Sequence, residues 1–280
     1  MQKKKLFLVL SIGFLLGLLF LVGLIISNNN LKSQFFQQKT ESVDDTLLSS
    51  PQSEVTPKPI STDSTITTAP ESQLTPTPTT APPSSIKFNV PFTSQAPLGD
   101  WDDPFQQDGC EEASALMAVY WARGKIITSP EAARDIIVDA GKWQLQHYQT
   151  ARDASAEDTA SRIIQGYFDW PHVQVKELIN YEQILEELYA GNLVITPMDG
   201  QKLGNPNFTG DGPERHMLVV IGYNADTQEF ITNDPGTRRG RDYAYDKDLF
   251  MAAVRDYPTG DHEPISKEKK TMIVVLKESF

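Results

Sequence analysis

The single cysteine is the first residue whose chemistry stands out. The run Asp108-Gly109-Cys110-Glu111 is typical of a helix start, with Asp108 as the N-cap and Glu111 at the capping-box position. Unpaired N–H groups and the helix dipole favour a thiolate in such a first turn. Glu111 and Glu112 oppose this effect, because nearby negative charge disfavours ionisation of a thiol. A reactive Cys110 therefore requires a neighbouring cation such as an imidazolium, and the alternative is a buried structural cysteine.

One of the four histidines is placed differently from the others. His216 directly precedes the apolar run 217–221, which predicts a strand, and a turn is predicted near Ala225. A hairpin that turns there would place His216 opposite Asp234. Directly opposed residues have Cβ atoms about 4.5–5.5 Å apart, so the carboxylate could orient the imidazole.

Together, a thiol, an imidazole and a carboxylate have the composition of a site for acyl transfer. The histidine would take the thiol proton, the thiolate would attack a carbonyl, and the carboxylate would hold the correct tautomer. Such a site also needs donors for the oxyanion, and the N–H of Cys110 together with a side-chain amide would suit. The candidate amides are those of Gln95, Gln106 and Gln107.

The elements that must position these residues mix helices and strands. Apolar residues at helical spacing predict a buried helix over 111–123. Further helices are predicted around 130–140, 156–166, 181–190 and 246–255, and strands at 193–196, 217–223, 229–232 and 271–276. Helices come first and strands cluster late, which favours an α+β fold over a βαβ alternation.

The chain divides into three parts. Residues 6–26 carry no charged side chain and follow three lysines, and about 21 apolar residues span the ~30 Å hydrocarbon layer. No small-residue cleavage site follows, so residues 1–27 are expected to be a cytoplasmic stub and a retained transmembrane signal anchor rather than a cleaved signal peptide. Residues 28–85 are rich in Ser, Thr, Pro and Gln and predict a disordered linker. Only residues 86–280 are expected to fold as a domain, on the extracytoplasmic side of the membrane.

Composition excludes several classes of protein. The 280 residues include 37 acidic and 25 basic side chains, for a net charge of −12, which argues against a nucleic-acid partner. One cysteine cannot form an internal disulfide, and the scattered histidines do not suggest a zinc site. We therefore expect no metal and no cofactor. The oligomeric state is not readable from the sequence.

Four motifs in this order resemble the C39-like peptidase domain, which has a papain-like fold. They are Val90-Pro91-Phe92-Thr93-Ser94-Gln95, Gly109-Cys110-Glu111-Glu112-Ala113-Ser114, the run 216–223, and Asn233-Asp234-Pro235-Gly236, so the resemblance covers residues 87–278. The resemblance implies that Cys110 is the nucleophile, His216 the base and Asp234 the orienting acid. It also implies that Gln95 is the oxyanion donor, with Gln107 as the rival.

The leading hypothesis is a membrane-anchored, extracytoplasmic cysteine peptidase that cleaves peptides or proteins through a thioester. One alternative keeps the same three residues but is an acyltransferase, a transpeptidase or a peptidoglycan amide hydrolase. A second alternative is a non-catalytic surface-binding module on a stalk. The basic segment 237–241 follows Asp234 and could steer a substrate carboxylate, or it could be an ordinary solvated loop.

Overall fold

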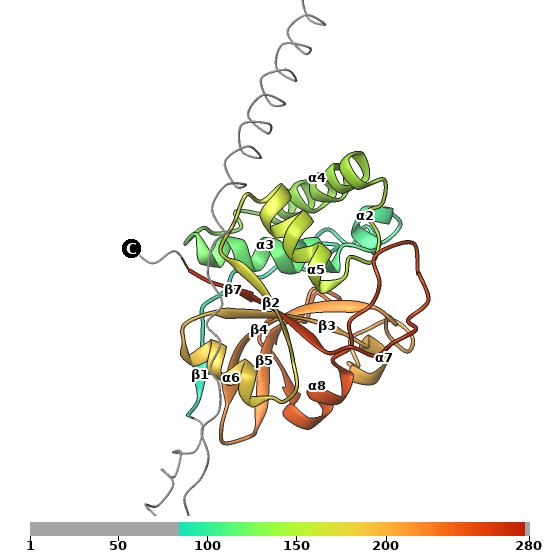
Figure 1. Ribbon diagram of the computed structural model, residues 1–280. Helices are drawn as coiled ribbons and strands as arrows, with labels where there is room; N and C mark the ends of the chain where they lie inside the picture. The colour runs from blue at the N-terminus through green and yellow to red at the C-terminus, as the bar shows by residue number, and fades with distance from the viewer. Residues whose placement is uncertain (1–83, 278–280) are drawn as a thin grey trace, which may run out of the picture. The chain divides into compact units, whose positions relative to one another are not determined.

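The computed structural model describes residues 84–277, which form an antiparallel sheet with helices on both faces (Figure 1). The predicted membrane anchor at 6–26 and the linker up to residue 83 lie outside the described residues. Within 84–277, none of the helices combines the length and the apolar character that a membrane span requires.

The sheet brings together strands that are far apart in the chain. In the described residues it has seven strands, in the order β2-β7-β3-β4-β5-β6, with β1 paired to β4. Their bounds are β1 Ile86–Lys87, β2 Val173–Glu177, β3 Leu193–Met198, β4 His216–Asn224, β5 Glu229–Asn233, β6 Tyr243–Asp246 and β7 Thr271–Val275. Each pair is antiparallel, and β4 lies between β3 and β5.

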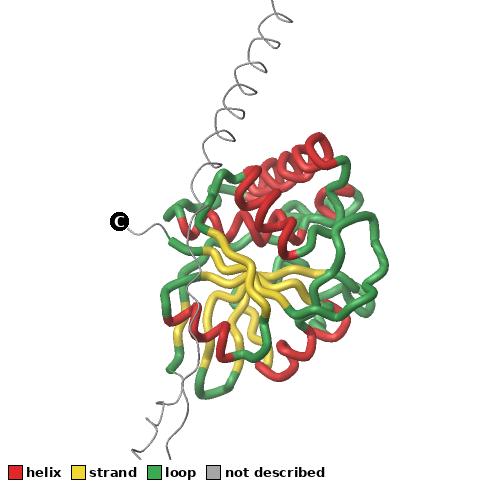
Figure 2. The backbone as a smooth tube through the Cα atoms, in the orientation of Figure 1, coloured by secondary structure: helices red, strands yellow, loops and turns green. Residues whose placement is uncertain are grey.

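Helices cover both faces of this sheet. They are α2 Pro104–Gln107, α3 Cys110–Ala122, α4 Pro130–Tyr148, α5 Ala156–Asp158, the π-helix η1 Thr159–Tyr167, α6 Glu182–Tyr189, α7 Gly200–Leu203 and α8 Lys247–Ala253. Figure 2 shows the strands between the two groups of helices. Along β4, Val219 packs in the core with α3 and η1, whereas Leu218 and Val220 pack in the core with α6 and α8. A strand buried on both faces explains why 217–221 is continuously apolar.

The mixed helix and antiparallel-sheet architecture predicted from the sequence is confirmed. Three strands were not predicted: β1 has only two residues, and neither β2 nor β6 contains a run of apolar β-branched residues. The helix predicted at 156–166 is instead a single α-turn followed by the π-helix η1. The buried side chains of η1 are Thr159, Ala160, Ile163 and Ile164.

The start of α3 differs from the prediction. Asp108 is not its N-cap; it follows α2, and its Oδ2 pairs with Arg152 Nε at 2.8 Å. Gly109 is the N-cap and offers no side-chain hydrogen bond. A Cβ at Gly109 would lie 2.5 Å from the carbonyl oxygen of Phe105, so the tight passage from α2 to α3 leaves room only for glycine.

The register predicted for the β4–β5 hairpin is wrong. Val219 lies opposite Asn233 and Gly222 opposite Ile231, with a bulge between Val220 and Gly222. The turn between the two strands spans 225–228 and is therefore centred beyond Ala225, which shifts every pair. Regular pairing ends at Val219, so His216 and Asp234 are not directly opposed residues.

A buried isoleucine of α4 supports the segment that precedes Cys110. Ile137 is fully buried, and its Cγ2 lies 3.0 Å from the position that a Cβ on Gly109 would take. We expect Ile137→Ala to lower the free energy of unfolding by about 2–5 kcal/mol in urea denaturation. The matched control, Ile126→Ala, removes the same atoms from a side chain that is 74% exposed and should stay within about 0.5 kcal/mol of the wild type. Equal effects would contradict the packing described here.

Candidate active site

The imidazole of His216 and the carboxylate of Asp234 form a buried pair at one end of the sheet. His216 is the first residue of β4 and Asp234 follows the last residue of β5. His216 Nε2 lies 2.8 Å from Asp234 Oδ1, and the two residues are 1% and 0% exposed. Side-chain reach therefore joins these two residues although the strand register does not oppose them.

Several donors keep Asp234 ionised. Its Oδ1 accepts the N–H of Gly236 at 2.9 Å, and its Oδ2 accepts the hydroxyl of Tyr245 at 2.6 Å and the amide of Asn205 at 3.4 Å. Burial by itself would raise the pKa of Asp234, but His216 and these donors outweigh it and hold the pKa below its usual value. An ionised carboxylate only accepts hydrogen bonds, so His216 Nε2 carries a proton, and in the neutral ring the lone pair lies on Nδ1.

Cys110 and His216 line the same cavity. Its volume is about 620 Å³, and Gln95 and Gln107 also line it. The start of α3 is tied to the start of β4, since the hydroxyl of Ser114 donates to the carbonyl oxygen of Met217 at 3.2 Å. Ser114 lies one turn after Cys110 and Met217 follows His216, so this bond fixes the two elements that carry the thiol and the imidazole.

A second carboxylate contacts the thiol directly. Cys110 Sγ donates to Glu111 Oε2 at 3.1 Å, and the hydroxyl of Tyr257 donates to Glu111 Oε1 at 2.8 Å. Burial, followed by the charge of Glu111, raises the pKa of Cys110 well above its usual value. Burial likewise raises the pKa of Glu111 to about 7. The thiol is therefore protonated in this conformation, and the opposition of Glu111 to ionisation is the one expected from the sequence.

Of the three candidate amides, the structure brings two to the cavity. Gln95 and Gln107 line it, whereas Gln106 is buried beside it. The backbone N–H of Gln95 donates to the carbonyl oxygen of Pro235 at 2.9 Å, which fixes this segment beside Asp234. Its side-chain Nε2 donates to the carbonyl oxygens of Gln106 and Gln107 at 3.1 and 2.7 Å. Service as an oxyanion donor would require one of these two N–H groups to leave its carbonyl.

Hydrogen-bonded acidic and basic side chains also line this cavity. Arg152 bridges Asp108 and Asp261, with shortest N···O distances of 2.8 and 2.6 Å. Asp153 Oδ2 accepts from His262 Nδ1 at 2.8 Å. Within residues 84–277, no group of three or more His, Cys, Asp or Glu side chains is arranged to hold a metal ion.

Sequence reasoning missed the residues that support the site from other elements. Tyr245 and Asn205 contact Asp234, and Tyr257 contacts Glu111. Phe208 meets the imidazole of His216 edge-on, with ring centroids 5.3 Å apart. Of these residues, only Tyr245 could have been found from the sequence. It alternates with Tyr243, which is the spacing of a strand, and this segment closely follows Asp234.

A family model identifies the family of this chain. The model of the Peptidase_C39 like family matches residues 87–259, which is more than half of the chain. A crystal structure from Bacillus anthracis, provisionally described as a C39-like peptidase, is 15% identical and covers 70% of this chain and 100% of its own, with a TM-score of 0.39. A score of that size does not establish a shared fold, so the assignment rests on the sequence match. No curated protein matches the chain.

The contact between Cys110 and Glu111 predicts a change in thiol ionisation. Glu111→Gln keeps an acceptor for Tyr257 but removes the charge, so the pKa of the thiol should fall. Whole-protein mass spectrometry of iodoacetamide labelling at a series of pH values measures it, because Cys110 is the only cysteine. Glu157→Gln, the same change at an exposed glutamate, is the control. An unmoved titration midpoint in Glu111→Gln would exclude this role for the carboxylate.

Proposed function

Because the chain belongs to the Peptidase_C39 like family, we propose that it is a cysteine peptidase that hydrolyses peptide amide bonds through a thioester on Cys110. The observation that carries this proposal is the 2.8 Å bond between His216 and Asp234 at a cavity that Cys110 also lines. Thiol, base and orienting carboxylate are the groups that amide cleavage by a thiol requires. The substrate is accordingly a peptide or a protein.

Acylation begins with the proton of the thiol. Cys110 turns from Glu111 towards the imidazole, and His216 Nδ1 takes the proton as Sγ attacks the substrate carbonyl carbon. The imidazolium that forms is stabilised by the ionised Asp234. The tetrahedral intermediate then collapses, the C–N bond breaks, and the imidazolium gives its proton to the leaving amine. A thioester on Cys110 and a free amine result.

Deacylation uses the same groups in reverse. His216 takes a proton from water, the hydroxide attacks the thioester carbonyl, and Cys110 leaves as a thiolate that regains the proton. In both halves the oxyanion is stabilised by the N–H of Cys110, which has no partner within the helix because it lies in the first turn of α3, and by the side-chain amide of Gln95. Gln107 is the alternative amide, since it lines the same cavity.

The location of the enzyme follows from the residues before the domain. We propose that residues 6–26 anchor the chain in the cell membrane, with the N-terminus in the cytoplasm and the domain at 86–280 outside. The charge-free segment after three lysines supports this orientation, and residues 28–85 would act as the spacer.

Digestion of denatured casein by the full-length protein tests the activity. We expect new peptide termini with the wild type and a loss of at least about 10³-fold in rate for Cys110→Ala and for His216→Ala. Ile126→Ala, which alters an exposed side chain, should retain the wild-type rate. Adding a primary amine shows whether acyl transfer competes with hydrolysis, because a transferase would form the amide product in preference to the acid. Cleavage that persists in Cys110→Ala would exclude a thiol mechanism.

A further inference from the structure

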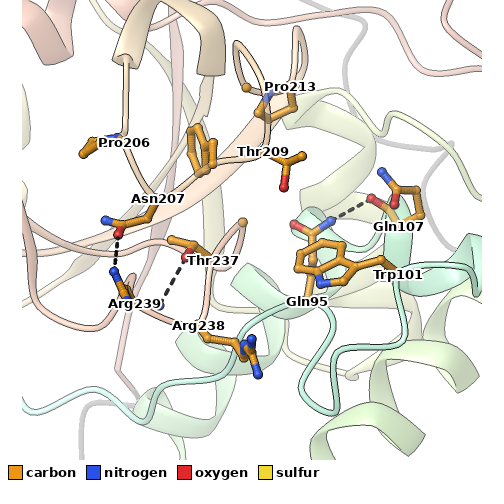
Figure 3. A pocket seen from close by; sticks show the side chains of 13 residues that line it. Gln95, Trp101, Gln107, Pro206, Asn207, Thr209, Pro213, Thr237, Arg238 and Arg239 are labelled. Carbon is orange, nitrogen blue, oxygen red and sulfur yellow. Dashed lines mark hydrogen bonds between the residues drawn. The ribbon is translucent and has the colours of Figure 1, made fainter.

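A second, larger cleft adjoins the cavity of Cys110. Its volume is about 930 Å³, and it shares Gln95, Gln107 and Pro213 with that cavity. Figure 3 shows Trp101 and Gln95 on one side of this cleft and Asn207, Thr237 and Arg239 on the other. The three shared residues place the two hollows side by side, so a peptide bound in the larger cleft lies next to the cavity that Cys110 lines.

Two residues that line the larger cleft lie next to His216, the proposed base. Phe208 lines the cleft and packs edge-on against the ring of His216. Gly236 lines it as well, and a Cβ at Gly236 would lie 2.9 Å from His216 Cε1. A ligand bound in the larger cleft is therefore separated from the imidazole of His216 only by Phe208 and Gly236.

Charge distinguishes this cleft from the rest of the molecule. Arg238 and Arg239 are the charged residues among those that line it, and none of the lining residues is acidic. By contrast, the cavity of Cys110 is lined by acidic and basic residues together, and the whole chain has a net charge of −12. A purely cationic cleft on an acidic protein is complementary to an anionic ligand.

Neither arginine is neutralised by a partner. Both side chains are exposed, and within residues 84–277 neither forms an ion pair with a carboxylate. Arg239 Nη1 lies 3.5 Å from the amide oxygen of Asn207, a neutral acceptor that a carboxylate would outcompete. In the same cleft, Trp101 and Phe208 offer apolar surface for the rest of the ligand. A cleft that combines guanidinium groups with aromatic walls suits an acidic peptide segment.

We propose that Arg238 and Arg239 form a subsite for a carboxylate of the peptide substrate, and that this subsite selects acidic segments for cleavage at Cys110. The inference rests on the proposed peptidase function for the cleavage, but binding of the acidic segment depends only on the cleft. A nucleic acid would meet the overall negative charge of the chain beyond two arginines, so a peptide carboxylate is the ligand that the charges favour.

Binding of blocked octapeptides to full-length Cys110→Ala tests this subsite without requiring catalysis. Isothermal titration calorimetry at about 20 mM salt should give an affinity at least about tenfold higher for alternating Gly and Glu than for alternating Gly and Gln. The affinity of the Gly and Gln peptide with a free C-terminus is measured as well. Comparing it with the affinity of the blocked Gly and Glu peptide shows whether the subsite prefers a terminal carboxylate or a side-chain carboxylate. The preference should shrink at about 200 mM salt.

Two variants decide whether the arginines are responsible. The double variant Arg238→Gln and Arg239→Gln should bind both blocked peptides alike. Arg241→Gln is the matched control: it removes one positive charge from the same loop, but Arg241 lies over the ring of Phe92 and does not line the cleft. It should keep the preference. Equal affinities in Cys110→Ala, no binding of any peptide, or a preference that survives in the double variant would overturn the proposal. Failure of casein cleavage alone would count against the peptidase function and leave this result standing.

Discussion

A buried carboxylate stays ionised only where enough hydrogen-bond donors surround it. The arrangement of the site therefore depends on how the fold brings such donors to Asp234. β4 supplies His216, β6 supplies Tyr245, the chain after β5 supplies the N–H of Gly236, and the loop before β4 supplies Asn205. Four separate segments must therefore meet at one end of the sheet. With Asp234 charged, the tautomer of His216 is set, and its Nδ1 is left as the basic nitrogen.

The second buried carboxylate has the opposite environment. Glu111 receives hydrogen bonds from the Cys110 thiol and the Tyr257 hydroxyl, but burial dominates and brings its pKa to about 7. One site thus holds a carboxylate beside the imidazole whose pKa is lowered and another beside the thiol whose pKa is raised. Opposite pKa shifts of this kind allow two carboxylates in one site to take different roles. In the proposed mechanism Asp234 stabilises the imidazolium, and Glu111 favours the protonated thiol before the substrate binds.

The sequence predicted much of this arrangement because its strongest signals are local. The apolar run after His216, the helix beginning beside Cys110 and the turn before β5 are each readable from neighbouring residues. What it could not supply came from exact turn geometry and from packing between segments. The turn at 225–228 shifted the hairpin register, and the tight α2–α3 junction made Gly109, not Asp108, the N-cap. Tyr257 reaches Glu111 across 146 positions in the chain, and no local pattern encodes such a contact.

Trapping of the acyl-enzyme tests the central claim, that Cys110 is a nucleophile activated by His216, most directly. The full-length protein would be mixed rapidly with p-nitrophenyl acetate, quenched in acid, digested and analysed by mass spectrometry. The account predicts a burst of acetyl on Cys110 in the wild type, labile to hydroxylamine as a thioester is, and no burst in His216→Ala. Acetyl on another residue, or a burst of equal rate and size in His216→Ala, would contradict it.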